Sequence, residues 1–574
     1  MEIVLTPEYH DLFPGEQDDL DELLKDIPSL LLIQLIALLN AELYSNDKGQ
    51  ETQVKIFHLM LGLQPPVIKM QIIENALKKI RRNPKEDTHF FSILYNMNFL
   101  HYELINYRDL PMVDLTPTQE LNVFKAYFLV VERVNKEYRD TLKSTPDFDD
   151  AYFGKMTWPT LIDQFELNYH PDPYPIMVRG TVFFNFLQVH SSYNTYVASY
   201  LRKHNKVTAL NYLLDIYHLL IAAYQKTKNL KAEGWASFST SVAPGFETLF
   251  EQFTLDQKEY QEQFGKGKSN YSGIKSKPLY RLENNNYLIL SWGFLTNKMY
   301  EGLVFDFYKQ SGIGESPDFK EFTSFKRFVG NQITEQYLSR KLLRAIFKDK
   351  YQVLLFDDQG IAGFPDAYYR KGNDVIIFEI KDAYFPASAV NAFSYEKITE
   401  AIDLKMNNSG KGTGQFIKQL RTLSQKPFET PQGYKYARNL NIYPVIIYAD
   451  VIFNMPGIDQ YLEDAFQKKV KENDLEKHFR KIKPLTVINL SFLIKNFDLL
   501  EQPNTRLTHL IDHYHQTIKT RKKRSYRTRD MEDHLHVYQT FEHVVSELLP
   551  YNDPSRDYVA ASTKALDLSE ALPQ

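Results

Sequence analysis

The chain of 574 residues contains no cysteine. This absence excludes disulfide bonds, thiolate metal sites and a cysteine nucleophile. Because disulfides belong mainly to oxidising compartments, a chain without them fits the reducing cytoplasm, where we expect the protein to be located. Hydrophobic residues make up 43% of the composition, which is enough for a globular protein, and the length predicts two or more domains.

The chain also lacks an excess of charge and a long apolar run. Its 68 basic and 72 acidic residues give a formal net charge of −4, so any binding to nucleic acid must come from local basic patches. The most apolar run, residues 30–39, contains Gln34 and is too short to span a bilayer. Residues 1–8 have neither the basic start nor the apolar centre of a signal peptide. We therefore expect a soluble protein with no membrane partner.

The sequence has no Walker-type phosphate loop, which argues against an ATP-driven helicase on this chain. It has no convincing internal repeat, so a solenoid is unsupported. From about residue 27 to residue 230 the apolar residues recur at helical spacing. Residues 116–119 predict a capping box, with Pro117 at the first helical position. We expect residues 1–263 to form a mainly α-helical region that serves recognition or oligomerisation.

A polar, glycine-rich stretch, residues 264–270, predicts a boundary or loop. After it, two strand-like runs flank residues 283–286 in the manner of a β-hairpin. We expect residues 264–317 to be a linker and connection that contains this hairpin.

One stretch in the second half of the chain contains the candidate catalytic residues. Residues 375–381 alternate as a strand does, so Glu379 and Lys381 project from the same face. The turn-rich residues 370–374 fold an earlier strand back as a hairpin, which brings Asp366 beside Glu379. Two close carboxylates repel each other unless a cation lies between them, and hard oxygen ligands suit Mg²⁺ or Mn²⁺. The alternative is an ordinary hairpin with a surface glutamate and lysine.

Pro365-Asp366 followed by Glu379-Ile380-Lys381 resembles the signature of the PD-(D/E)xK nuclease superfamily, which has the restriction-endonuclease-like fold. The resemblance implies an α/β domain with a mixed sheet flanked by helices, and metal-dependent hydrolysis of phosphodiester bonds. It implies that Asp366 and Glu379 hold a Mg²⁺ or Mn²⁺ ion, with the Ile380 carbonyl as a further ligand. In the same way, Lys381 would position or activate the attacking water.

The predicted order of elements over residues 318–500 matches the common core of that fold. A helix near residues 333–343 precedes a strand over 351–356 and the hairpin, and two later strands, 442–448 and 484–490, are separated by a helix.

The resemblance also implies two further site residues. A glutamate on the first core helix often joins the metal site in this superfamily, and Glu335 occupies that place; the alternative is a solvated helix residue. Several branches place a glutamine on the helix after the lysine strand, where it contacts the site or the nucleic acid. Gln415 or Gln419 could be that residue, and the alternative is an exposed helical glutamine.

Residues 519–529 contain seven basic residues and no acidic one, within a helical, basic extension that we expect over residues 501–574. Such runs contact phosphates without reading sequence, although a solvated linker is the alternative. The residues we assign to these contacts are Lys522, Lys523, Arg524 and Arg527. His509 and His513, one helical turn apart, suggest a zinc site as a further alternative, but the spacing fixes no third ligand.

These patterns predict a Mg²⁺-dependent endonuclease that acts on DNA, with a role in bacterial anti-phage defence or restriction by analogy with the resembled superfamily. One alternative is a non-catalytic protein that binds nucleic acid or a partner through a nuclease fold, and the complete Asp, Glu and Lys set argues against it. Another is a nuclease of RNA or of single strands. The helical first half is compatible with a homo-oligomer or with a defence-system partner protein.

Overall fold

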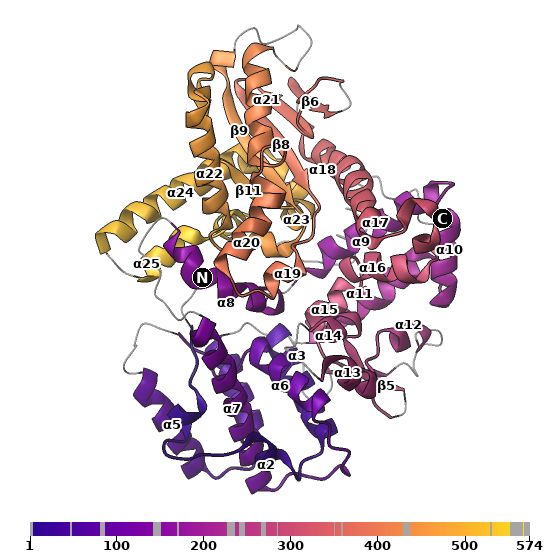
Figure 1. The fold of residues 1–574 in the computed structure, drawn as a ribbon, viewed down its shortest axis with the longest axis vertical. Coiled ribbons are helices and arrows are strands. Elements are labelled where there is room, and N and C mark those ends of the chain that lie inside the picture. Colours follow the sequence, from indigo (N-terminus) through magenta and orange to yellow (C-terminus); the bar gives the residue numbers. More distant parts are fainter. Residues whose placement is uncertain are drawn as a thin grey trace.

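The computed structural model describes residues 4–45, 49–80, 87–141, 151–168, 171–226, 236–239, 247–265, 271–283, 285–348, 350–357, 360–426, 428, 437–528, 531–550 and 566. Figure 1 shows the helices up to α7 at one end of the molecule and the large sheet with its covering helices at the other. The helices from α9 to α17 lie along one side, and α8 lies between the two ends.

The described residues up to 226 are predominantly helical. A short parallel strand pair accompanies them, β1 (Val4–Leu5) and β2 (Asp87–Thr88). The helices are α1 (Tyr9–Leu12), α2 (Leu20–Leu24), α3 (Ser29–Ser45), α4 (Gln50–Met60), α5 (Pro66–Ile80), α6 (Ile93–Ile105), α7 (Pro117–Thr141), α8 (Tyr152–Asn168), α9 (Pro173–Val189), α10 (Asn194–Lys203) and α11 (Ala209–Lys226).

Helix α7 forms as the sequence predicts. The Gln119 N–H donates to Thr116 Oγ1 at 3.3 Å, and the Thr116 N–H donates to Gln119 Oε1 at 3.1 Å, which is a reciprocal capping box. Pro117 is the first helical residue, where its missing N–H costs nothing. The buried face of α7 carries apolar residues at helical spacing, including Val123, Phe124, Tyr127, Phe128, Val131 and Val134.

The next part of the chain contains the predicted hairpin. Strands β4 (Leu279–Arg281) and β5 (Asn286–Ile289) pair in antiparallel fashion, and β3 (Ser237–Ser239) joins the other edge of β5. The accompanying helices are α12 (Glu247–Gln252), α13 (Gln257–Phe264), α14 (Ser272–Ser276), α15 (Trp292–Asn297) and α16 (Glu301–Gln310). Within the predicted connection, residues 266–270 lie outside the described residues.

A helix of three segments leads into the sheet domain: α17 (Phe322–Phe328), the π-helical η4 (Val329–Leu338) and α18 (Ser339–Ile346). Among the described residues, six strands form the large sheet. They are β6 (Gln352–Phe356), β7 (Ala367–Lys371), β8 (Asp374–Lys381), β9 (Asn441–Tyr448), β10 (Lys481–Ile482) and β11 (Thr486–Asn489).

The sheet is mixed, with β8 near its centre. Strands β6, β7 and β8 form an antiparallel meander, whereas β9 lies parallel to β8, and β10 and β11 both lie parallel to β9. Parallel neighbours require helical crossovers, and the chain supplies them. The helices after β8 are α19 (Ala387–Val390), α20 (Tyr395–Ile402), the π-helical η6 (Asp403–Asn407) and α21 (Thr413–Gln425); α22 (Ile458–Glu472) follows β9.

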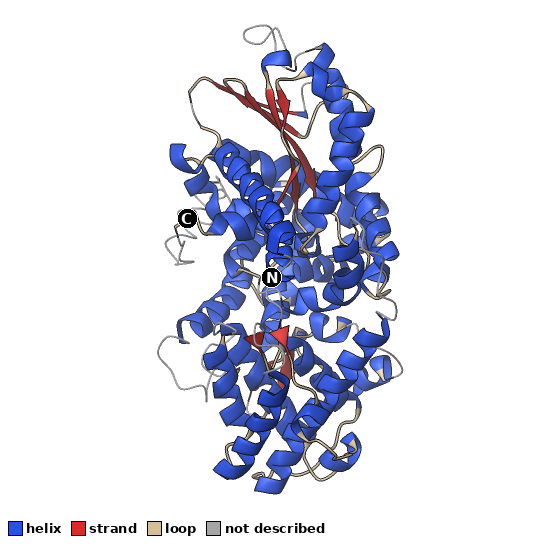
Figure 2. Ribbon diagram, turned by 90° about the vertical axis from the view of Figure 1, so that its left-hand side faces the viewer, coloured by secondary structure: helices blue, strands red, loops and turns tan. Residues whose placement is uncertain are grey.

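Helices cover both faces of the sheet, so β8 and β9 are almost continuous apolar runs. One face, with Val375 and Ile377 of β8, packs against α20, α21 and α22. The opposite face, with Ile376 and Phe378, belongs to a core that includes α18, α23 (Leu490–Leu500) and α24 (Leu507–Thr528). Figure 2, turned by 90°, shows the strands between these helices. The last helices among the described residues are α25 (Met531–Leu535) and α26 (Phe541–Ser546).

The structure therefore confirms the predicted helical N-terminal region followed by a C-terminal mixed sheet flanked by helices. Over the ranges that the structure describes, no helix combines the length and the apolar character needed to span a lipid bilayer.

Candidate active site

The β7–β8 hairpin determines where Asp366 lies. Its two-residue connection contains Gly372, whose φ of +62° falls in the left-handed region that glycine adopts without strain. The antiparallel pairing of β7 with β8 extends from this turn to its last residue pair, Ala367 and Phe378. Asp366, the residue before β7, therefore lies level with Glu379, as the alternation of the strand predicts.

The end of β8 extends beyond that last pair, and Asp366 binds its backbone. The Ile380 N–H donates to Asp366 Oδ2 at 2.6 Å. The N–H and C=O of one strand residue point to the same side, so the Ile380 carbonyl also points toward the side of Asp366. The next carbonyl points the other way: Lys381 O accepts from the Ala449 N–H at 3.1 Å. The Ile380 carbonyl thus lies on the side where the resemblance implies a metal ligand.

Lys381 brings the two carboxylates into one ionic group. Its Nζ donates to Glu379 Oε2 at 2.9 Å and lies 3.8 Å from Asp366 Oδ2. The Glu379 side chain is fully buried, whereas Lys381 is 16% exposed and Asp366 is 22% exposed. The group therefore has a protein-facing side and a side that solvent reaches.

Glu335 joins this group from the π-helical segment η4. It lies close enough to Asp366 and Lys381 to interact with both electrostatically, and the Asp382 backbone lies beside its carboxylate. The helix can approach the strand end because residue 330 is glycine: a Cβ there would lie 3.0 Å from the Asp382 carbonyl oxygen. A π-helical turn inserts one extra residue per turn, and such turns occur frequently at functional sites.

Burial and mutual repulsion change the acidity of these groups. Burial, followed by the nearby Asp366 carboxylate, raises the pKa of Glu379 to about 8 and that of Glu335 to about 8. Burial also raises the pKa of Asp366. Burial alone would lower the pKa of Lys381, but the carboxylates of Glu379 and Asp366 outweigh it and raise that pKa.

The charges and donor atoms of this group fit a divalent cation. Three carboxylates and one ammonium leave two negative charges when all are ionised, and hard cations prefer oxygen donors of this kind. Burial and the neighbouring Asp366 carboxylate raise the pKa values of Glu379 and Glu335, so a cation bound beside them would stabilise their ionised forms. Asp366 and Glu379, with the Ile380 carbonyl, could hold Mg²⁺ or Mn²⁺, and Glu335 is the further carboxylate within reach.

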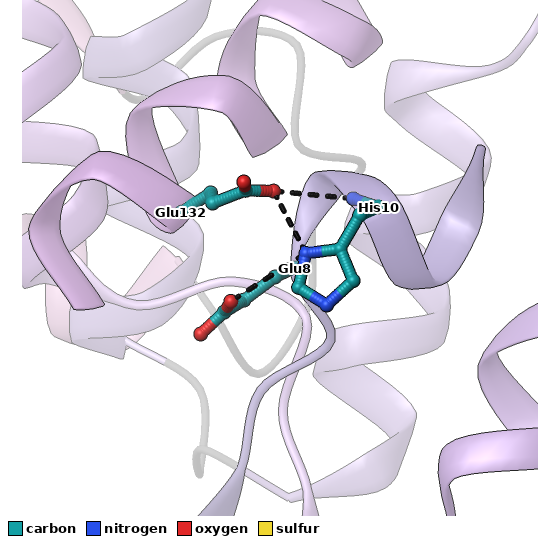
Figure 3. Close-up of side chains that lie close together, drawn as sticks. All are labelled: Glu8, His10 and Glu132. Atoms are coloured by element: carbon teal, nitrogen blue, oxygen red, sulfur yellow. Dashed lines mark hydrogen bonds and ion pairs between the residues drawn. The ribbon is translucent and has the colours of Figure 1, made fainter. Parts of the chain in front are cut away.

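A different cluster is the tightest one in geometric terms. Among the described residues, Glu8, His10 and Glu132 are the one group of three His, Asp or Glu side chains whose ligand atoms all lie within 4.8 Å of one another (Figure 3). The His10 side chain is 60% exposed, and Arg139 pairs with Glu8. This arrangement is a surface ion-pair network whose charge the arginine partly compensates, and we assign it no metal.

The glutamine that reaches the site is Gln419, on α21. Its Nε2 donates to Glu379 Oε1, and the side chain is buried. Gln415, the other glutamine that the sequence makes a candidate for contact with the site or the nucleic acid, lies one helical turn earlier and is partly exposed. Both lie on the predicted helix, and helical spacing alone does not decide which of them faces the sheet.

Residues 519–528 of the basic run lie on α24, which extends from the sheet domain toward α25 at the left of Figure 1, and Arg529 lies outside the described residues. The four residues assigned to phosphate contacts are exposed, and Arg524 Nε also lies 3.0 Å from Asp533 Oδ1. Nearby, His515 accepts or donates a hydrogen bond with Thr486 at 2.8 Å, and burial lowers the pKa of His515 to about 4. Among the described residues, neither His509, His513 nor His515 belongs to a cluster of three possible metal ligands.

Sequence reasoning missed the residues behind the site. The Asp382 carboxylate accepts from Thr334 Oγ1 at 2.5 Å and from Lys326 Nζ at 2.6 Å. Asp382 follows Lys381 directly, but nothing in the local spacing indicates partners 48 and 56 residues away.

Comparisons of this chain with protein-family models, curated proteins and solved structures give no significant match.

Proposed function

We propose that the protein is a metal-dependent nuclease with a restriction-endonuclease-like C-terminal domain, and that it hydrolyses phosphodiester bonds in DNA. The observation that supports this function most directly is the convergence of Asp366, Glu379 and Lys381 at the end of β8, with Glu335 beside them. The order of helix, three-stranded meander, helical crossover and parallel strand is consistent with the same proposal.

Each residue of the site would have a separate role in this mechanism. Asp366, Glu379 and the Ile380 carbonyl would hold the ion, and a bound Mg²⁺ or Mn²⁺ would polarise the attacking water and offset charge on the phosphate. Lys381 contacts the Glu379 carboxylate, and the carboxylates of Glu379 and Asp366 raise its pKa when no ion is bound. Beside the ion, Lys381 would position or activate the attacking water and place a positive charge beside the phosphate.

The choice of DNA follows from the resemblance, and α24 offers an exposed basic face for the backbone. A role in anti-phage defence or restriction, and cytoplasmic location, belong to the same proposal. The test is incubation of the purified protein with plasmid, linear duplex, single-stranded DNA and RNA, each with Mg²⁺, Mn²⁺ or EDTA. Cleavage of RNA alone would redirect the substrate assignment, and binding without cleavage would favour a non-catalytic protein.

We expect Asp366→Ala, Glu379→Ala and Lys381→Ala each to lower the cleavage rate at least about a hundredfold, because each removes a ligand or a charge at the reacting phosphate. Glu400→Ala is a matched control: it removes an exposed carboxylate whose 2.9 Å pair with Lys397 contributes little to stability. Melting curves verify that each variant is folded. Wild-type rates in any two of the three site variants would remove the site assignment.

A further inference from the structure

Asp382 occupies a junction between the candidate site and the helices that precede the sheet. It is the first residue after β8, and its side chain is 1% exposed. One carboxylate oxygen, Oδ2, accepts from Thr334 Oγ1 at 2.5 Å and from the Tyr300 hydroxyl at 3.4 Å. The other, Oδ1, accepts from Lys326 Nζ at 2.6 Å and lies 4.0 Å from Arg179 Nη2.

These partners come from separate elements. Arg179 lies on α9 of the helical first half, Tyr300 directly precedes α16, Lys326 lies on α17 and Thr334 on η4. Arg179 is itself buried, pairs with Glu301 Oε1 at 2.6 Å and lies 3.9 Å above the Tyr300 ring. A single carboxylate therefore joins four helical segments to the end of β8.

The hydrogen bond to Thr334 has a direct geometric consequence for the site. Thr334 and Glu335 are neighbours on η4, and Asp382 and Lys381 are neighbours at the end of β8. The hydrogen bond between Thr334 and Asp382 therefore fixes the position of Glu335 along η4 relative to Lys381 on β8. The close approach of residue 330 to the Asp382 carbonyl leaves η4 little freedom to shift.

We propose that Asp382 is a positioning residue that clamps the Glu335-bearing helix η4 to the Lys381-bearing strand β8, and that through Arg179 it makes the metal site depend on the helical first half. This inference rests on the proposed function, because it assumes that the carboxylates beside Lys381 bind a metal. Asp382 acts through Thr334 and contacts neither metal nor phosphate.

The test uses a pair of substitutions at Thr334. Thr334→Val keeps the shape but removes the hydroxyl, whereas Thr334→Ser retains the hydroxyl as the conservative control. Loss of a partner that orients a metal ligand typically weakens metal binding by about tenfold or more, and a displaced Glu335 should weaken it on the same scale. We therefore expect titration calorimetry of the full chain with Mn²⁺ to show about tenfold weaker binding for Thr334→Val and near wild-type binding for Thr334→Ser. Asp382→Asn should weaken Mn²⁺ binding at least as much.

A second measurement tests, in the absence of metal, whether Asp382 holds η4 against β8 through Thr334. Amide hydrogen exchange of the metal-free protein should be faster over residues 329–338 in Thr334→Val than in the wild type or Thr334→Ser, and unchanged over residues 507–528. Wild-type Mn²⁺ affinity or unchanged exchange over 329–338 in Thr334→Val would overturn the proposal. If the wild type binds no Mn²⁺, the proposed function fails, and the exchange result alone then decides whether the clamp exists.

Discussion

At the scale of single residues, the charge balance at the end of β8 gives a direct test of Asp366. Without metal, at a pH above 8 where Glu379 and Glu335 ionise, Asp366→Asn should melt no lower than the wild type, because it relieves the repulsion that helps raise their pKa values. Asparagine still offers an oxygen to the Ile380 N–H. With Mg²⁺ the order should reverse, since an ion at a hundred times its Kd stabilises the form that binds it by about 2.7 kcal/mol.

The measurement is a set of melting curves with and without Mg²⁺ at fixed ionic strength. Asp374→Asn is the matched control: the same substitution at the other end of β8, where Asp374 accepts from Asn441 Nδ2 at 2.8 Å. It should gain as much melting temperature from Mg²⁺ as the wild type does. An equal gain in Asp366→Asn, with Mn²⁺ and Ca²⁺ as well as Mg²⁺, would show that Asp366 is not a ligand.

The residues of the site differ in how far the sequence could predict them. Period-two alternation and a hairpin turn bring Glu379, Lys381 and Asp366 together, because both are local rules. The choice of Gln419 over Gln415 depends on which face of α21 meets the sheet, and that is decided by tertiary packing. The role of Asp382 is also decided by tertiary packing, since its partners are brought to it by helices that are distant in sequence.

At the scale of elements, α24 gives a test of nucleic-acid binding. Replacing Lys522, Lys523, Arg524 and Arg527 together by glutamine should weaken binding to duplex DNA and flatten its dependence on salt. For every phosphate that the variant no longer neutralises, the slope of log affinity against log salt concentration should become shallower by about 0.9. Arg524 should contribute least, because Asp533 already lies beside it.

The matched control for α24 changes the same number of exposed charges on other elements. It replaces Lys258, Lys468, Lys471 and Lys477 by glutamine; these residues are exposed, and Lys477 pairs with Asp474 as Arg524 pairs with Asp533. Titrations of labelled duplex at several salt concentrations compare the two quadruple variants with the wild type. Equal slopes for the α24 variant and the wild type would leave this helix without a role in phosphate contacts.

The elements themselves were largely predictable, and the exceptions have a physical cause. The strands β8 and β9 and the cap of α7 follow from alternation, apolar runs and side-chain hydrogen bonds within four residues. The π-helical form of η4 was not predictable, because its apolar spacing resembles that of an α-helix. Its neighbours in the folded molecule, β8 and α9, are distant in sequence, so local spacing carries no information about them.

At the scale of the whole molecule, the sheet domain shares its packing with the helical first half. From α8, Trp158 is buried, stacks on Tyr395 of α20 at 5.5 Å and donates its Nε1–H to the Pro456 carbonyl at 2.9 Å. From α9, Phe186 packs against the rings of Phe328 and Tyr337 on the helix that leads into the sheet. Segments before residue 200 thus contact the helical layers of the sheet domain from two directions.

This shared packing predicts that residues 318–574, produced alone, will not form a stable domain. The fragment would expose apolar surface that α8 and α9 cover, and buried apolar area stabilises by about 25 cal/mol per Å². We expect it to bind a hydrophobic dye and to melt without a cooperative transition, and we expect co-expression of residues 1–317 to restore both properties. In the full chain, Trp158→Ala should lower stability by about 3–5 kcal/mol, whereas Trp158→Phe should cost less because it keeps a ring against Tyr395. A fragment with a sharp transition at the melting temperature of the full chain would show instead that the sheet domain is stable by itself, and that its contacts with α8 and α9 join two independent domains.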